Sequence, residues 1–140
     1  MFDACSSLVT SPNLPATILN YGCYASMFQG CKSITEATIS ATTFASPSPP
    51  TVPGDVIGCC ASLFQNCSSL TSVTVNFTSW PDLTGVNMYQ TLSNWLFSEN
   101  FPIGEFHKPT ELPEEYSTSN NLFSKIPQGW TVINKQEGDN

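Results

Sequence analysis

The chain of 140 residues has the length of one domain with a modest core. Eleven acidic and four basic residues give a net charge of −7, which argues against nucleic-acid binding because phosphates require clustered lysine and arginine. Charged residues make up only 11% of the chain, against ~25% in ordinary soluble domains. Serine, threonine and asparagine take their place, which indicates an extracellular protein. No apolar run is long enough to predict a transmembrane helix.

A phrase built around phenylalanine and cysteine occurs three times in the first half of the chain. The copies are MFDACSSLVTSPNL (residues 1–14), MFQGCKSITEATI (27–39) and CCASLFQNCSSLTSVTV (59–75). They align three columns of apolar residues: Cys5, Cys31 and Cys67, then Phe2, Phe28 and Phe64, then Leu8, Ile34 and Leu70. One copy cannot bury its apolar side alone, so the pattern predicts stacked repeats of ~20–29 residues, the leucine-rich-repeat range.

Each copy predicts a short helical arm followed by a short strand. In Cys59–Cys67 the apolar residues are spaced as on one face of a helix, and in Leu70–Val75 they are closer to the alternation of a strand. The same argument predicts a helix over Gly22–Cys31 and strands over Leu8–Leu14 and Ile34–Ile39. These units form residues 1–80 of the predicted architecture.

Two other segments depart from the repeat. Ser46–Asp55 contains four prolines and is predicted to be a loop inserted into one repeat. After Phe77 the repeat register is lost, and residues 81–140 are predicted to be a C-terminal cap of mixed α and β structure. The elements expected there are a helix (Asn87–Phe97), a strand broken at Gly104 (Phe101–His107), an acidic loop (Pro109–Tyr116), a short helix (Asn120–Ile126) and a final strand (Gly129–Asn134).

The repeated phrases resemble those of the BspA-like leucine-rich-repeat surface proteins of gut and oral bacteria. The motifs that carry the resemblance are CYASMFQGCKSIT (23–35), CCASLFQNCSSLT (59–71), LPAT (14–17) and IPQGWTVINK (126–135). Leu63 and Asn66 stand where the phrase has methionine and glycine, and Ile34 replaces its leucine. The resemblance implies an α/β solenoid, a right-handed superhelix of about three short leucine-rich repeats closed by a C-terminal cap.

Five of the six cysteines recur at equivalent repeat positions: Cys5, Cys31 and Cys67 at one, Cys23 and Cys59 at another. Buried free thiols, a disulfide and a metal site all remain open for them. Free thiols are favoured because side chains in one column point the same way, and the adjacent pair at residues 59–60 lacks the spacing of zinc ligands. Cys60 stands where the preceding copy has Tyr24, so it is the cysteine expected to be exposed or reactive.

Few residues invite catalytic chemistry. His107 is the only histidine, and a nucleophilic pair with Cys60 is conceivable, but a surface histidine is the simpler interpretation. Three acids beside prolines favour a solvated loop over an acid–base pair or a calcium site: Glu111, Glu114 and Glu115. Trp80, in the turn SWPD, is the tryptophan best placed to expose its ring to a carbohydrate. We therefore expect no enzyme activity, no cofactor and no metal.

The resemblance implies a non-enzymatic protein of the cell surface that binds host proteins, glycans or other cells. The expected binding face is the outward side of the strands: Thr35, Glu36, Thr38, Thr71, Ser72 and Thr74. The alternatives are a structural spacer within a larger surface protein and a thiol-reactive enzyme that uses Cys60. Because the first copy begins in mid-unit, we expect a signal, an anchor and further repeats upstream. Self-association through the uncapped N-terminal end is also expected.

Overall fold

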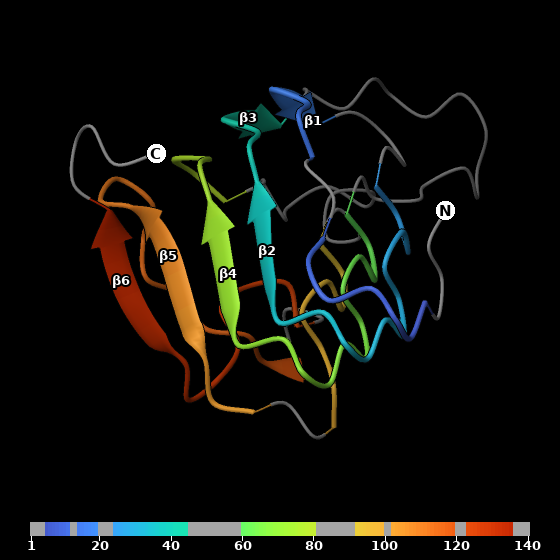
Figure 1. Cartoon of the computed structure of the whole chain (residues 1–140). Helices are drawn as coiled ribbons and strands as arrows, with labels where there is room; N and C mark the ends of the chain where they lie inside the picture. Colours follow the sequence, from blue (N-terminus) through green and yellow to red (C-terminus); the bar gives the residue numbers. More distant parts are fainter. Residues whose placement is uncertain are drawn as a thin grey trace.

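The computed structural model describes residues 5–11, 14–19, 24–44, 60–80, 92–99, 102–119 and 123–135. Its strands, in chain order, are β1 (Ile18–Leu19), β2 (Glu36–Ile39), β3 (Thr43–Phe44), β4 (Ser72–Val75), β5 (Glu105–Pro109) and β6 (Thr131–Lys135). The strands β2, β4, β5 and β6 form one parallel sheet in that order, and β1 pairs with β3 in a second (Figure 1). Parallel neighbours that follow one another in sequence require the chain to return to the same end after each strand, so the arrangement is solenoid-like.

Four of the five predicted strands are found in this sheet. β2 and β4 lie within the predicted ranges 34–39 and 70–75, and β5 and β6 overlap the predicted ranges 101–107 and 129–134. The first predicted strand, over 8–14, is wrong in its extent. It is reduced to isolated bridges from Thr10 to Glu36 and from Leu14 to Ile39. The predicted proline-rich insert at 46–55 lies outside the described residues.

Tight turns stand where the sequence predicted helical arms. Residues 24–30 and 60–66 are turns, and the described part of the chain contains no α-helix. The reason lies in the backbone, because Ser26, Ser62 and Asn94 adopt left-handed φ values of 54°, 56° and 53° that end a right-handed helical turn. The predicted helices over 87–97 and 120–126 are also wrong in their described residues, since 92–96 are turns and Ile126 forms a bridge with Tyr116.

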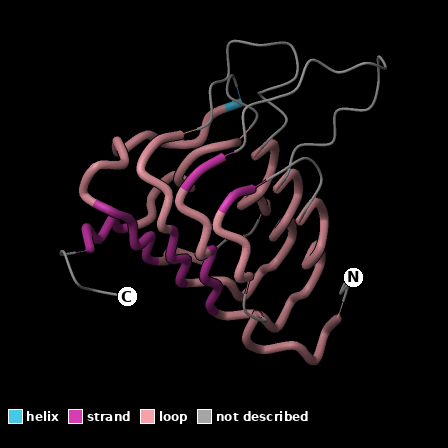
Figure 2. The backbone as a smooth tube through the Cα atoms, turned by 90° about the horizontal axis from the view of Figure 1, so that it is seen from above, coloured by secondary structure: helices cyan, strands magenta, loops and turns pink. Residues whose placement is uncertain are grey.

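The turns stack on one another through their backbones. The N–H groups of three residues in each turn donate to carbonyl groups of the next turn along the chain, at 2.8–3.0 Å: Ser26 to Ala61, Phe28 to Leu63, Gly30 to Gln65, Ser62 to Ser93, Phe64 to Trp95 and Asn66 to Phe97. Figure 2 shows the successive coils of the chain lying side by side, with the four-stranded sheet along one side. These bonds satisfy the amide groups that an isolated helix would have bonded internally.

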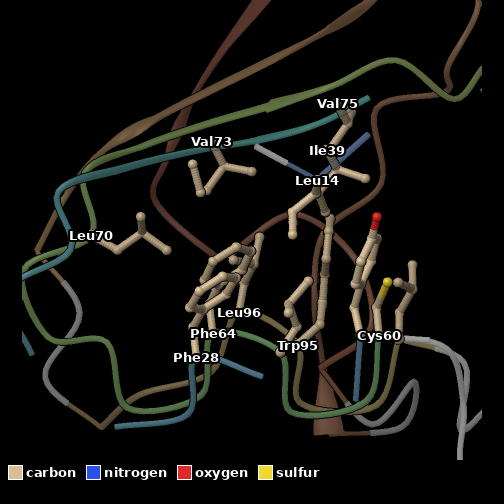
Figure 3. Packing of buried hydrophobic residues seen from close by; sticks show 14 of the residues in the cluster. Leu14, Phe28, Ile39, Cys60, Phe64, Leu70, Val73, Val75, Trp95 and Leu96 are labelled. Carbon is tan, nitrogen blue, oxygen red and sulfur yellow. The ribbon is translucent and has the colours of Figure 1, made fainter. Parts of the chain in front are cut away.

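The core lies between the sheet and the stacked turns. The strands contribute inward residues that are at most 4% exposed: Ala37, Ile39, Val73, Val75 and Phe106. Facing them, the rings of Phe28 and Phe64 stack with centroids 5.5 Å apart and an angle of 7° between their planes (Figure 3). Each buried side chain of this size contributes roughly 1.5–3 kcal/mol of apolar burial. The alternation of apolar residues in the sequence therefore fixes which side of each strand faces the core.

The repeat continues beyond Phe77, where the sequence pattern is lost. The third turn, residues 92–96, matches the second, residues 60–66, position by position. The backbone bonds between these turns align Leu92 with Cys60, Asn94 with Ser62 and Leu96 with Phe64. The division between repeats (1–80) and cap (81–140) stays a prediction, although the sheet itself runs through that boundary from β4 to β5. Among the described residues, no helix is long and apolar enough to cross a membrane.

Candidate binding face

The outward side of the four-stranded sheet is the candidate site, and strand alternation builds it. In β2, Glu36 and Thr38 are exposed while Ala37 and Ile39 are buried, and β4 and β5 repeat this alternation. Most of the outward residues are polar because they meet water on one side of a sheet whose other side carries the core.

The strand register orders these side chains in two rows that run across the sheet. The first row contains Thr10, Glu36, Ser72, Glu105 and Thr131, and the second contains Thr38, Thr74, His107 and Ile133. We call these two rows the outward face. Paired residues on neighbouring strands lie about 4.8 Å apart, so each row presents a ladder of side chains at nearly constant spacing.

Four of the six predicted site residues lie in the outward face: Glu36, Thr38, Ser72 and Thr74. Thr35 and Thr71 lie just before the strands, where Thr71 Oγ1 donates to the carbonyl of Thr35 at 3.3 Å. The same carbonyl accepts the N–H groups of Thr71 and Ser72. These two threonines are exposed, and they join the entries of β2 and β4.

The part of the outward face that lies on β5 and β6 was not predicted from the sequence. Glu105, His107, Thr131 and Ile133 continue the two rows, although their segments lack the phrase that marks the earlier copies. The two segments carry no clear alternation that could have placed them, because Lys108 takes an inward position of EFHKP and the apolar Val132 and Ile133 are adjacent in TVINK.

The outward face is acidic at two points of its first row. Glu105 Oε2 lies 3.1 Å from His107 Nε2, with 54% and 27% of the respective side chains exposed. Glu36 is exposed two strands away. Neither row contains a lysine, and the chain contains no arginine.

Three of the four lysines are engaged elsewhere, and the fourth, Lys32, is exposed before β2, outside the two rows. Lys108 is 3% exposed and points to the core side, where its Nζ donates to the carbonyl of Leu112 at 2.6 Å and to Asn134 Oδ1 at 2.8 Å. Lys125 Nζ lies 3.0 Å from Glu115 Oε2. Lys135, one row beyond the outward face, donates to the side-chain oxygen of Asn76. These contacts leave the negative charges of the outward face without a neighbouring ammonium group in the described sheet.

Trp80 is not the exposed ring that the sequence predicted. It is half-buried, and its ring packs against Phe77 and Phe106 with centroids 5.6 and 6.3 Å away. Its Nε1 donates to the carbonyl of Pro113 at 2.9 Å, and Lys125 Nζ lies 4.8 Å from the ring centroid. The segment that carries Trp80 folds onto an aromatic cluster, so one side of the ring packs against the core.

The expectation for Cys60 is also wrong, because Cys60 is fully buried in the second turn. It lies on the core side of the sheet and His107 on the outward side, so the two cannot form a catalytic pair.

The four described cysteines, Cys5, Cys31, Cys60 and Cys67, are thiols. Cys67 donates to the carbonyl of Phe28 at 3.0 Å. Burial, together with the neighbouring Cys31, raises the pKa of Cys67 to about 12.

The three acids beside the prolines are exposed and do not act as a unit. Glu115 pairs with Lys125, and Glu114 accepts a hydrogen bond from the hydroxyl of Tyr116. That hydrogen bond raises the pKa of Tyr116. Within the described ranges, no three histidine, cysteine or acidic side chains gather as metal ligands.

An open pocket of about 170 Å³ lies away from the outward face. Leu96, Phe97, Phe123 and Pro127 form its apolar wall. Ser117, which also lines the pocket, already accepts two hydrogen bonds within the protein. The Ser117 carbonyl accepts from Gln128 Nε2, and the Ser117 hydroxyl oxygen accepts the N–H of Lys125. The pocket therefore presents mainly apolar surface, with no unpaired polar group on Ser117 to orient a ligand.

A scan against protein-family models, a search of curated proteins and a search of solved structures each find no match to this chain.

Proposed function

We propose that this chain is a non-enzymatic binding module whose outward face binds a protein or glycan ligand. In this proposal it forms part of a secreted or cell-surface protein that attaches to host molecules or to other cells. Its repeats are a short right-handed leucine-rich-repeat solenoid closed by a C-terminal cap, as the resemblance to BspA-like surface proteins implies.

The single observation that supports a binding role is the two-row array on the outward face. Nine side chains from five segments stand in register there, and none of them is needed to fill the core. All of these side chains except Ile133 carry hydroxyl, carboxylate or imidazole groups, which offer hydrogen-bond donors and acceptors at regular intervals. Such a rigid array loses little conformational freedom when a ligand binds, which favours its use in recognition.

The thiol-reactive enzyme is the weaker hypothesis for a physical reason. Nucleophilic cysteines need access to substrate and a stabilised thiolate. Cys60 and Cys67 are both 0% exposed, and the raised pKa of Cys67 keeps it protonated. The purely structural spacer remains the rival that experiment must separate from the binding module.

A binding screen tests the proposal. The purified chain is applied to arrays of extracellular-matrix proteins and glycans at physiological salt, and each hit is titrated to saturation. The double variant Glu36→Ala/Thr74→Ala is expected to weaken the affinity for a genuine ligand by about tenfold, since both residues belong to the outward face.

The matched control is Glu111→Ala/Thr78→Ala, which changes the same residue types at exposed positions outside the outward face. It is expected to retain the affinity of the unchanged chain. A blank array, obtained with a chain shown by circular dichroism to be folded, would reject the binding module in favour of the spacer.

A further inference from the structure

We propose that the ligand of the outward face is a cationic protein segment whose lysine or arginine side chains reach Glu36 and Glu105. This inference rests on the proposed binding function and adds the chemistry of the partner.

The two carboxylates stand in the same row with Ser72 between them. The register pairs Ser72 with Glu36 on one side and with Glu105 on the other. Two strand spacings place the Cα atoms of the two glutamates about 10 Å apart. Long lysine or arginine side chains from a single extended segment span that distance, and the Ser72 hydroxyl lies between the two cations as a further acceptor.

The charge of the surroundings selects against an anionic ligand. The two rows hold two carboxylates, one histidine whose Nε2 lies 3.1 Å from Glu105 Oε2, and no lysine. The lysine nearest to them along the sheet, Lys135, is held by Asn76, and exposed Lys32 lies before β2, outside the rows. Lys108 and Lys125 are buried and engaged by carbonyl and carboxylate groups. A sulfated or acidic glycan would bring like charge to Glu36 and Glu105, whereas a basic segment would neutralise them.

An exposed apolar side chain lies beside the acidic row. Ile103 is 79% exposed and stands two residues before Glu105, so strand alternation places it on the side of the outward face. Its neighbour Gly104 is buried against the backbone of Thr71. Lysine and arginine cover apolar surface with their aliphatic stems while the charged head remains in water. Ile103 can therefore pack against the stem of a residue whose charge reaches Glu105.

Fluorescence anisotropy with labelled poly-L-lysine and poly-L-glutamate peptides of equal length tests this proposal. Poly-L-lysine is expected to bind, with an affinity that falls as salt rises, and poly-L-glutamate is not. Glu36→Gln/Glu105→Gln is expected to weaken binding of poly-L-lysine about fivefold, the effect of two exposed ion pairs. Ile103→Ser is expected to weaken it about twofold.

The matched control is Glu99→Gln/Glu111→Gln, which makes the same change of net charge at exposed positions outside the outward face. It is expected to alter the affinity less than twofold. Equal weakening by the two double variants would overturn the proposal, because the attraction would then follow net charge alone.

Failure of poly-L-lysine to bind, or preferential binding of poly-L-glutamate, would likewise overturn the cationic partner. Either result leaves the binding function standing if the array of proteins and glycans gives a hit that Glu36→Ala/Thr74→Ala removes. The binding function itself fails only when that array is blank. Circular dichroism of each variant establishes that the fold is retained.

Discussion

Gly104 lies directly against the backbone of Thr71, where β5 begins to pair with β4. The N–H of Glu105 donates to the carbonyl of Thr71 at 2.8 Å. A Cβ atom at residue 104 would stand 2.5 Å from the Thr71 oxygen and 2.9 Å from its carbon. Backbone atoms cannot yield as a flexible side chain does, so only glycine allows this approach.

We therefore expect Gly104→Ala to lower the free energy of unfolding by about 2 kcal/mol, as measured by urea denaturation. Gly129→Ala is the matched control, because a Cβ there meets nothing within 4 Å although φ is +82°. It is expected to cost about 1 kcal/mol of backbone strain. An equal loss of unfolding free energy in the two variants would mean that the contact with Thr71 has no steric importance.

Cys67 makes stability depend on pH in the alkaline range. Its pKa rises from 9.0 to about 12 in the folded protein, chiefly because burial disfavours the thiolate. The folded state therefore holds a proton that the unfolded state releases, and the stabilisation is complete below pH 9 and is lost as pH rises toward about 12.

Urea denaturation of reduced protein between about pH 8 and pH 11 checks this expectation. Cys67→Ala is expected to show a shallower decline of the unfolding free energy with pH than the unchanged chain, whatever its stability at neutral pH. Cys5→Ala, which removes a thiol that is only partly buried, is the matched variant for the loss of a cysteine side chain. An unchanged slope in Cys67→Ala would contradict the burial of that thiol.

The turn is the element that distinguishes this fold from the architecture expected from sequence. Ser26, Ser62 and Asn94 share a left-handed backbone, and the N–H groups of Ser26 and Ser62 donate to the next turn. Apolar spacing did not reveal this conformation, because a helix and a stacked turn both carry Phe28 and Phe64 to the core. The strands were easier to predict, since alternation has a period of two and turns do not imitate it.

Substitution at Ser62 tests the turn conformation. Ser62→Gly is expected to leave stability unchanged or to raise it by up to about 1 kcal/mol, because glycine adopts φ of 56° without strain. Ser62→Val is expected to lower it by about 1–2 kcal/mol, since a branched Cβ resists that conformation. Thermal and urea denaturation measure both changes.

Ala61→Val is the control for the added side-chain volume, at a neighbouring half-buried position that lacks a positive φ. A helical arm would reverse the first result, because glycine within a helix costs about 1 kcal/mol relative to alanine. Destabilisation by Ser62→Gly together with tolerance of Ser62→Val would therefore contradict the turn.

At the scale of the whole molecule, each coil contacts mainly its neighbours, as in other solenoids. β2 pairs with β4, β4 with β5 and β5 with β6, while the turns form a parallel stack beside them. An aromatic cluster joins the second half of this stack, with Trp95 and Phe106 centroids 6.1 Å apart. A substitution that weakens one coil is therefore expected to destabilise the adjoining coils more than the distant ones.

Phe106→Leu is expected to accelerate amide hydrogen exchange in β4, β5 and β6 more than in β2 and residues 24–30. Phe106 is fully buried on β5, so its loss acts on the adjoining strands first. Phe28→Leu, at a fully buried position within residues 24–30, is the matched variant. It is expected to accelerate hydrogen exchange more in β2 and residues 24–30 than in β4, β5 and β6. Uniform acceleration in both variants would mean that the chain opens as a single unit.

The candidate site was predictable only in the first half of the chain. Glu36 and Thr74 could be placed on the outward side because EATI and SVTV alternate and recur in the same phrase. Glu105 and His107 lie in EFHKP, which lacks both that phrase and a clear alternation, so its register against SVTV could not be predicted. The backbone hydrogen bonds between the strands set that register, and they do not depend on which side chains the strands carry.

The sequence by itself determined the stacked strands and, for β2 and β4, the side that faces the core. Alternation and the recurrence of the phrase suffice for this, because Val73 and Ile39 must leave water whatever their neighbours are. Only the tertiary structure decided the form of the arms, the burial of Cys60, the packing of Trp80 against the core, and the extent of the sheet. Those features depend on N–H groups that bond to another coil and on aromatic rings from distant segments. The local spacing of apolar residues is the same with or without these contacts, so it does not predict them.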